Sequence, residues 1–328
     1  MKICLYGAGA IGGLMGVRLA QKGAEVSVVE VGAPLAAIQA NGLKVQSGGQ
    51  MYSAKVKASS EPAELGVQDL IIVAVKGPTL KFVAQKIGAL IGPETIIMTA
   101  MNGVPWWFFE GFGGALAGTQ LKSVDPDGSI GKGVPANRVI GCVINLSCSL
   151  VEIGVVNHVS GNSLTIGEPN NTVSDRANKL CAMLTDAGFD VNVTPSIQKD
   201  IWFKLFGNMT HNPISAITGA TTDVIIDDPL TADFCVKIMN EAGAVGAKIG
   251  CVITDTAEAR NAKTRKMGAF KTSMLQDVEA KKALEIDALL TAPREIAKLV
   301  GVETPYMDVL LGLTRVKGQM MGIYPKNA

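Results

Sequence analysis

The feature that most constrains the fold is a glycine-rich segment, GAGAIGG, which begins at residue 7 directly after the apolar run KICLY. Within it, Gly7, Gly9 and Gly12 have the G-x-G-x-x-G spacing. A helical apolar pattern follows over residues 11–22, and a second apolar run, AEVSVVE, covers residues 24–30. This order of strand, glycine loop, helix and strand predicts the first βαβ unit of a Rossmann fold, with a dinucleotide bound at the loop.

Each glycine of the loop has a physical reason to be there. The first permits the tight turn out of the strand, the second lets the backbone approach a pyrophosphate, and the third lets the helix pack close to the sheet. The start of the helix offers free N–H groups and the positive end of its dipole to the phosphates. A tight turn without a ligand is the alternative explanation. The loop residues expected to contact the cofactor are Gly7, Ala8, Gly9, Ala10, Ile11 and Gly12.

An acidic residue, Glu30, ends the second predicted strand. A carboxylate at this place usually hydrogen-bonds the adenosine ribose hydroxyls and disfavours a 2′-phosphate. No Lys or Arg occurs between residues 31 and 43 to bind that phosphate. These residues alone therefore favour NAD over NADP, and an exposed charge at a strand end is the alternative explanation for Glu30.

Strands and helices alternate through the first part of the chain. Continuous apolar runs at 69–76 and 95–103 are typical of strands buried on both faces of a parallel sheet. Consecutive strands are predicted over 138–168, and a helix over 174–187 and a strand over 190–194 follow them. We therefore expect an α/β fold in which residues 1–195 form a Rossmann NAD(P)-binding domain.

Helical periodicity dominates the remainder of the chain. The predicted helices span 198–218, 229–250, 254–268, 274–300 and about 305–318. We therefore expect residues 196–328 to form an all-helical C-terminal domain, joined to the first domain by a hinge at Thr194-Pro195.

The composition excludes several classes of partner. Lys and Arg number 30 and Asp and Glu number 29, without a basic cluster, which argues against nucleic acid or an anionic membrane. No apolar run approaches the ~18–20 residues that span a bilayer, and we expect no secretory signal. Six scattered cysteines and two histidines do not resemble a metal site. We expect reduced thiols, a cytoplasmic location and no bound metal.

The segment IWFKLFGNMTHNP, residues 201–213, contains polar residues where an apolar helix is predicted. Lys204, Asn208 and Asn212 recur every four residues, so they lie on one side of that helix. A lysine whose stem covers apolar surface is the ordinary explanation for Lys204, and a helix boundary before Pro213 is an alternative for Asn212. Three hydrogen-bonding groups in one row also fit a helix face that binds a polar ligand.

Four more polar residues are candidates for the site. Lys76 and Asn102 each follow a buried strand, at the edge where open α/β sheets bind ligands, although solvated loop residues are also common there. Ser273 could instead cap a helix in the box Ser273-x-x-Gln276. Glu285 could instead pair with Lys281 or Lys282 on a helix surface.

Together these residues resemble the ketopantoate reductase (2-dehydropantoate 2-reductase) family over nearly the whole chain. The resemblance rests on GAGAIGG, VAVKG around Lys76, MNGVP around Asn102, IWFKLFGNMTHNPISAITG around Lys204, and SMLQD with EID around Ser273 and Glu285. It implies a Rossmann domain and a helical domain with the active site in the cleft between them. It also implies NADPH-linked reduction of 2-dehydropantoate to (R)-pantoate, in the biosynthesis of pantothenate and coenzyme A.

The resemblance also implies roles for individual residues. Lys204 would donate a proton to the ketone oxygen, and Glu285 would help to keep that ammonium protonated. The residues implied in substrate binding are Asn102, Asn208, Asn212 and Ser273. The residues implied near the nicotinamide ribose and the reaction centre, besides the glycine loop, are Lys76, Asn102 and Glu285.

Some positions depart from the family pattern. Val31 stands where the family usually has an arginine for the 2′-phosphate, and Thr222 stands where a further substrate-side asparagine is expected. The aromatic run from Trp106 to Phe109 fits core or interface packing better than a substrate contact. The alternatives are a reductase of another small branched 2-oxo acid, a related 3-hydroxy acid dehydrogenase, and a dinucleotide-sensing regulator without activity. The expected partner is a small-molecule 2-oxo acid, and a homodimer is left open.

Overall fold

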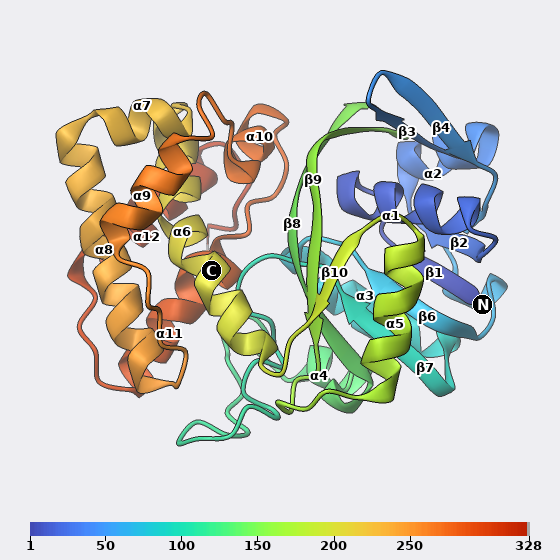
Figure 1. The fold of residues 1–328 in the computed structure, drawn as a ribbon, viewed down its shortest axis with the longest axis horizontal. Coiled ribbons are helices and arrows are strands. Elements are labelled where there is room, and N and C mark those ends of the chain that lie inside the picture. The colour runs from blue at the N-terminus through green and yellow to red at the C-terminus, as the bar shows by residue number, and fades with distance from the viewer. Residues whose placement is uncertain (327–328) are drawn as a thin grey trace. The chain divides into compact units, whose positions relative to one another are not determined.

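The computed structural model describes residues 1–326 and divides the chain into two compact units (Figure 1). The first unit comprises residues 1–101, 107–112 and 127–197, and the second comprises 102–106, 113–126 and 198–328. Parts of the long connection between residues 100 and 127 thus belong by their contacts to the second unit. The domain boundary at residues 195 and 196 stays a prediction.

The first unit is built on a ten-stranded sheet whose order is β4-β3-β9-β8-β7-β6-β1-β2-β5, with β10 paired to β9. Its strands are β1 (Lys2–Tyr6), β2 (Glu25–Val29), β3 (Leu43–Ser47), β4 (Gln50–Ala54), β5 (Lys57–Ser59), β6 (Gln68–Val73), β7 (Ile91–Thr99), β8 (Val139–Glu152), β9 (Val155–Gly167) and β10 (Asp190–Val193). Strands β5, β2, β1, β6, β7 and β8 pair in parallel, whereas β8 and β9 form a long antiparallel hairpin. The predicted α/β fold is confirmed, and its sheet is mixed.

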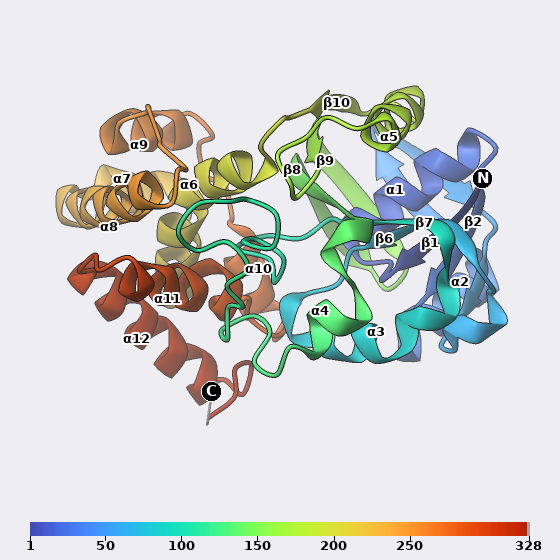
Figure 2. The ribbon, with the colours of Figure 1, turned by 90° about the horizontal axis from the view of Figure 1, so that it is seen from below.

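Helices cover both faces of this sheet. The α-helices of the unit are α1 (Ala10–Gln21), α2 (Gly32–Asn41), α3 (Leu80–Lys86), α4 (Ser129–Gly133) and α5 (Asp175–Asp186), and the 3-10 turns are η1 (Pro62–Glu64), η2 (Gly77–Thr79), η3 (Ile87–Leu90) and η4 (Ala136–Arg138). Figure 2 shows α1 and α5 on one face and α3 with α4 on the other. Ile3 and Leu5 point into the apolar core beneath α1 and α5, as the two-residue period of a strand requires.

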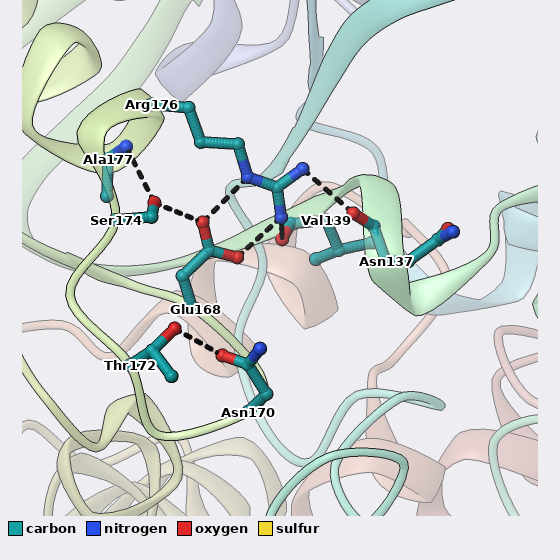
Figure 3. A network of polar contacts seen from close by, with 8 residues as sticks. All are labelled: Asn137, Val139, Glu168, Asn170, Thr172, Ser174, Arg176 and Ala177. Carbon is teal, nitrogen blue, oxygen red and sulfur yellow. Dashed lines mark hydrogen bonds and ion pairs between the residues drawn. The ribbon is translucent and has the colours of Figure 1, made fainter.

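An ion pair with one buried partner lies at the turn between β9 and α5 (Figure 3). Glu168 follows β9, its side chain is only 4% exposed, and its two carboxylate oxygens accept from Arg176 at 2.6 and 2.5 Å. Ser174 donates to the same carboxylate at 2.5 Å and also caps α5 by accepting from the Ala177 N–H. The network therefore fixes the turn from the hairpin into α5.

Replacing Arg176 by leucine is expected to lower the free energy of unfolding by about 3 kcal/mol, because the Glu168 carboxylate would stay buried without its cation. Chemical denaturation followed by circular dichroism measures this. The matched control is Lys22→Leu, which breaks the exposed pair with Asp186 and should cost less than about 1 kcal/mol. Equal effects of the two substitutions would contradict the prediction.

The second unit is helical. Its helices are α6 (Ile197–Thr218), α7 (Thr222–Asp227), α8 (Pro229–Lys248), α9 (Ala257–Arg265), α10 (Ser273–Glu279), the π-helical turn η5 (Asp287–Thr291), α11 (Ala292–Leu299) and α12 (Pro305–Met320). The prediction of an all-helical C-terminal region is confirmed. Within residues 1–326, none of these or the other helices combines the length and apolarity needed to cross a bilayer.

The single helix predicted over 274–300 is wrong. Helix α10 ends at Glu279, and Lys281 adopts a positive φ of 51°, which a regular helix does not allow. Residues 282–285 have no regular secondary structure, and Leu284 donates its N–H to the Ile323 carbonyl at 3.1 Å. The burial of Leu284 and Ile286 explains why tertiary packing prevails over helical propensity here.

Candidate cofactor and substrate site

The glycine loop has the geometry that its spacing predicts. Gly7 has φ of 93°, and Gly9 is the N-cap of α1. A Cβ on Gly12 would stand 2.1 Å from the Gly7 carbonyl oxygen, so only glycine allows this approach of helix to loop. A Cβ on Gly9 would meet nothing within 4 Å. The backbone of this loop therefore fits a pyrophosphate at the start of α1, where the first-turn N–H groups lack intrahelical acceptors.

Glu30 lies at the end of β2 and faces the glycine loop. Its Oε2 accepts a hydrogen bond from the Ala8 N–H at 2.8 Å, and its Oε1 accepts from the Val31 N–H at 3.3 Å. The exposed strand-end charge considered from the sequence therefore does not describe Glu30, which is half-buried. Because this carboxylate bonds the loop itself, it places a negative charge beside the predicted phosphate site.

A second carboxylate, that of Glu64, is bonded to Ser59 at the end of β5, the strand beside β2. The Glu30 N–H donates to the Ser59 carbonyl at 3.2 Å, and the Ser59 hydroxyl donates to Glu64 Oε2 at 2.6 Å. The nearby Lys86 ammonium is engaged by the Glu61 carboxylate at 2.9 and 3.1 Å. The Lys57 ammonium also donates to the Glu64 carbonyl, so side chains of both signs lie beyond the end of β2, and the carboxylate that bonds the glycine loop is that of Glu30.

In the second unit, Lys204 and Asn102 are brought together. Lys204 lies half-buried on α6, and its Nζ donates to Asn102 Oδ1 at 2.7 Å. An amide oxygen that accepts from an ammonium restricts the rotamers of the lysine side chain. The snorkelling lysine considered from the sequence therefore does not explain Lys204, because its ammonium has a fixed polar partner.

The other members of the polar row also lie on α6. The Asn212 amide donates to the Ser273 hydroxyl at 3.4 Å, so Asn212 and Ser273 are neighbours. Asn208 is half-buried, and its side chain makes no hydrogen bond within residues 1–326. Helix α6 continues past Pro213 to Thr218, so Asn212 does not end the helix.

Ser273 is not the helix cap that its sequence suggests. The N-cap of α10 is Thr272, whose hydroxyl accepts from the Leu275 N–H at 3.2 Å, and Ser273 is the first helical residue. The Ser273 hydroxyl is therefore not needed for capping. Its neighbour in the structure is the Asn212 amide.

Glu285 precedes the π-helical turn η5. The Leu289 N–H donates to the Glu285 carbonyl at 3.2 Å, and the Val104 N–H donates to the Ala288 carbonyl at 2.9 Å. The segment that carries Asn102 is thus bonded to the turn that follows Glu285. Residues 282–285 are not helical, so the pairing of Glu285 with Lys281 or Lys282 along a helix is absent. π-helical turns often occur at functional sites.

The first unit also contains Lys76, which was predicted as a site residue, and a cavity far from the glycine loop. Lys76 is half-buried and is the N-cap of η2, after the carboxyl end of β6. A cavity of about 370 Å³ lies at the opposite edge of the sheet, near Arg138 and Arg176, and contains none of the predicted site residues. The structure therefore gives this cavity no part in cofactor binding.

Sequence reasoning missed one charged residue beside the polar row. Arg260, on α9, holds its guanidinium against α6, with Cζ 5.4 Å from the centre of the Phe203 ring. A Cβ on Gly207 would stand 2.6 Å from Arg260 Nε. The signal that could have revealed it is Gly207 itself, because a glycine inside a helix usually marks a close approach.

The aromatic run from Trp106 to Phe109 is buried, with exposures between 0% and 3%. The Phe108 and Phe109 rings meet edge to face with their centres 5.0 Å apart, and Trp107 packs against Gly141. The preference for core packing over a substrate contact is consistent with this burial.

Comparisons with known proteins give a consistent result. Residues 3–171 match the family model "Ketopantoate reductase PanE/ApbA", and residues 196–318 match "Ketopantoate reductase PanE/ApbA C terminal". A 2-dehydropantoate 2-reductase of Mesorhizobium japonicum is 40% identical, with 99% of this chain and 100% of the relative covered.

Two solved structures share the fold of this chain. A crystal structure from Ralstonia solanacearum is 49% identical, with a TM-score of 0.95 and coverage of 98% of this chain and 99% of that chain. D-mandelate dehydrogenase, solved with NADH and anilino(oxo)acetate, is 24% identical, with a TM-score of 0.84 and coverage of 98% and 100%. At that identity the second likeness shows the fold alone.

Proposed function

The chain belongs to the ketopantoate reductase family, and from this premise we propose that it reduces 2-dehydropantoate to (R)-pantoate with a nicotinamide dinucleotide. It is an oxidoreductase, and the product would serve pantothenate and coenzyme A biosynthesis. The observation that carries the proposal is the hydrogen bond from the Lys204 ammonium to Asn102 Oδ1, beside a helix row that also contains Asn208 and Asn212.

The residues of the second unit would bind the keto acid and move the proton. When bound, the reduced dinucleotide supplies the hydride that adds to the ketone carbon. The Lys204 ammonium would stabilise the negative charge that develops on the ketone oxygen and would then donate the proton, to be recharged from solvent. Asn102 would direct the ammonium, since its Oδ1 lies 2.7 Å from Nζ. The substrate hydroxyl and carboxylate are assigned to Asn208, Asn212 and Ser273.

The residues of the first unit would hold the dinucleotide. The loop backbone and the start of α1 would bind the pyrophosphate, and Lys76 would lie near the nicotinamide ribose. The resemblance implies the same place for Asn102 and Glu285, which belong to the second unit. We propose NADH as the preferred reductant, although the family pattern implies NADPH. This rests on the Glu30 carboxylate at the loop and on Val31 in place of an arginine.

The deciding experiment is steady-state turnover of 2-dehydropantoate with NADH and NADPH in parallel. We expect turnover with both and a higher kcat/KM with NADH, since the 2′-phosphate would meet the Glu30 charge. Turnover of other small 2-oxo acids in the same assay is the control. A much higher kcat/KM for one of those acids would replace the proposed substrate, and a preference for NADPH would overturn the cofactor assignment.

The alternatives to this function are a reductase of another 2-oxo acid and a dinucleotide-sensing regulator without activity. Thr222, in place of the substrate-side asparagine that the family pattern implies, leaves room for a different substrate, namely another branched 2-oxo acid. A dinucleotide-sensing regulator without activity would not need the Lys204–Asn102 pair, so the pair disfavours it. Tight cofactor binding without turnover of any 2-oxo acid would restore the regulator.

A homodimer and a cytoplasmic location also belong to the proposal. Helix α12 exposes an apolar stripe at alternating spacings of three and four, which is the pattern of helix pairing: Tyr306, Val309, Leu313, Val316 and Met320. Light scattering on the purified chain gives its mass. All six cysteines are free thiols, as a reducing compartment requires, and cell fractionation tests the location.

A further inference from the structure

The C-terminal turn, which contains Ile323 and Tyr324, bonds the chain on both sides of Glu285. The Leu284 N–H donates to the Ile323 carbonyl at 3.1 Å. The Tyr324 hydroxyl donates to Asp287 Oδ1 at 2.7 Å. The chain directly before η5 has no regular secondary structure, so helical hydrogen bonds do not hold it there. The C-terminal turn therefore fixes the short segment in which Glu285 lies.

The π-helical turn η5, which the C-terminal turn holds, is also bonded to the loop that contains Asn102. The Ala288 carbonyl of η5 accepts from the Val104 N–H at 2.9 Å. A Cβ on Gly103, whose φ is 79°, would stand 2.6 Å from the same carbonyl oxygen, so the loop lies directly against η5. Asn102 Oδ1 accepts from Lys204 Nζ at 2.7 Å. A displacement of η5 therefore reaches the partner of the Lys204 ammonium.

Packing offers a simpler explanation for Tyr324. Its side chain is only 7% exposed and lies against Gly318 of α12, and a buried tyrosine hydroxyl usually bonds the nearest acceptor. Burial, and then the Asp287 carboxylate, raise the pKa of Tyr324, so its hydroxyl stays a donor. Thr291 donates to the same Asp287 oxygen at 3.1 Å. The ring alone would anchor the end of the chain, so the two explanations differ in what the hydroxyl does.

We propose that Tyr324 is a positioning residue for the proton transfer from Lys204. By holding Asp287 it keeps Glu285 and Asn102 in place, and both act on the ammonium in the proposed function, on which this inference rests. All five residues belong to the second unit. Misplacing a reacting group by 1 Å can lower a rate about 100-fold, so a residue remote from the substrate can affect kcat. The groups assigned to the substrate hydroxyl and carboxylate lie on α6 and α10, so substrate binding depends much less on Tyr324.

Tyr324→Phe removes the hydroxyl and keeps the ring. In steady-state reduction of 2-dehydropantoate we expect kcat to fall by roughly 10-fold, with KM changed much less. Tyr306→Phe is the matched control, since Tyr306 lies at the other end of α12, is 39% exposed and has its ring against Lys237. It should leave kcat and KM unchanged. A wild-type kcat in Tyr324→Phe would overturn the proposal and leave Tyr324 a packing residue.

Variants of Asp287 separate positioning from charge. Asp287→Asn keeps an oxygen that accepts from Tyr324, so it should retain most of kcat. Asp287→Ala loses that acceptor and should lower kcat at least as much as Tyr324→Phe. Equal losses in Asp287→Asn and Asp287→Ala would assign the effect to the carboxylate charge and would count against positioning by the hydroxyl.

Gly318→Ala displaces Tyr324 without changing it. A Cβ on Gly318 would stand 2.7 Å from Tyr324 Cβ and 3.4 Å from Leu284 Cδ1, so it would push on both attachments of the C-terminal turn. We expect kcat to fall at least as far as in Tyr324→Phe. The control is Gly312→Ala on the same helix, whose Cβ would meet nothing within 4 Å. It should leave kcat unchanged and raise Tm slightly, since alanine favours a helix.

Hydrogen exchange followed by mass spectrometry tests the same connection without turnover. The Val104 N–H bonds the Ala288 carbonyl, and the Leu289 N–H bonds the Glu285 carbonyl. Both amides should exchange faster in Tyr324→Phe than in Tyr306→Phe, while amides of α8 keep their rates. Unchanged exchange at Val104 would count against the proposal. If the wild-type protein reduces no 2-oxo acid but exchange at Val104 still depends on the Tyr324 hydroxyl, the proposed function fails and the connection from Tyr324 to the Asn102 loop stands.

Discussion

Lys204→Ala is expected to lower kcat for 2-dehydropantoate by roughly 10²–10⁴-fold, which is the usual contribution of a well-placed general acid. Without the ammonium, the charge on the ketone oxygen would be stabilised by amides alone and the proton would have to come from water. The fold should survive, because Lys204 is a half-buried residue of a long helix and alanine favours the helical conformation.

The measurement is kcat at saturating NADH and 2-dehydropantoate, with thermal unfolding of the same sample. Lys199→Ala is the matched control, since Lys199 is an exposed lysine on the same helix and should leave kcat unchanged. A folded Lys204→Ala protein with wild-type kcat would remove Lys204 from the mechanism. A variant that loses only affinity for the substrate would make Lys204 a binding group.

The polar row on α6 shows what helical spacing can and cannot predict. Because side chains four residues apart share a face, the row of Lys204, Asn208 and Asn212 could be read from the sequence. The partner of Lys204 could not, since Asn102 is 102 residues away along the chain and spacing carries no information at that separation. Only the family resemblance brought these two residues together before the structure did.

The fold was predictable where local pattern and tertiary environment agree. The strand, glycine loop and α1 follow their sequence closely, since a buried parallel strand and a tight turn each need specific residue types. The helix predicted over 274–300 failed because the chain leaves the helical conformation after Glu279, and residues 282–285, which include the buried Leu284, are irregular. The cap at Thr272 was missed because its neighbour Ser273 has the same capping chemistry.

Arg260 was missed for a different reason. A charged residue on a predicted helix is ordinarily a surface residue, and Arg260 is followed on α9 by Lys263 and Arg265, which are exposed and paired with carboxylates. Only the approach of its guanidinium to Gly207 separates it from them, and that approach depends on how α9 packs on α6. Helix packing of this kind is a tertiary property that composition and period do not contain.

The double variant Glu30→Ala with Val31→Arg is expected to raise the ratio of kcat/KM for NADPH to that for NADH by roughly 10²–10⁴-fold. The first change removes a carboxylate bonded to the Ala8 N–H, beside the loop. The second adds a guanidinium for the 2′-phosphate, and the Val31 side chain is 63% exposed, so an arginine fits. Hydrogen bonds to charged groups contribute about 1.5–3 kcal/mol each, which gives this range for two changes.

Each single variant should produce part of the shift, since the two changes act on the same ligand group through different atoms. Val67→Arg is the control for net charge alone, because Val67 is another exposed valine of the first unit, before β6. It should leave the ratio unchanged. If the double variant keeps the wild-type ratio while still reducing 2-dehydropantoate, the end of β2 does not choose the cofactor. The charge of Glu30 would then serve the loop conformation only, through its bond to Ala8.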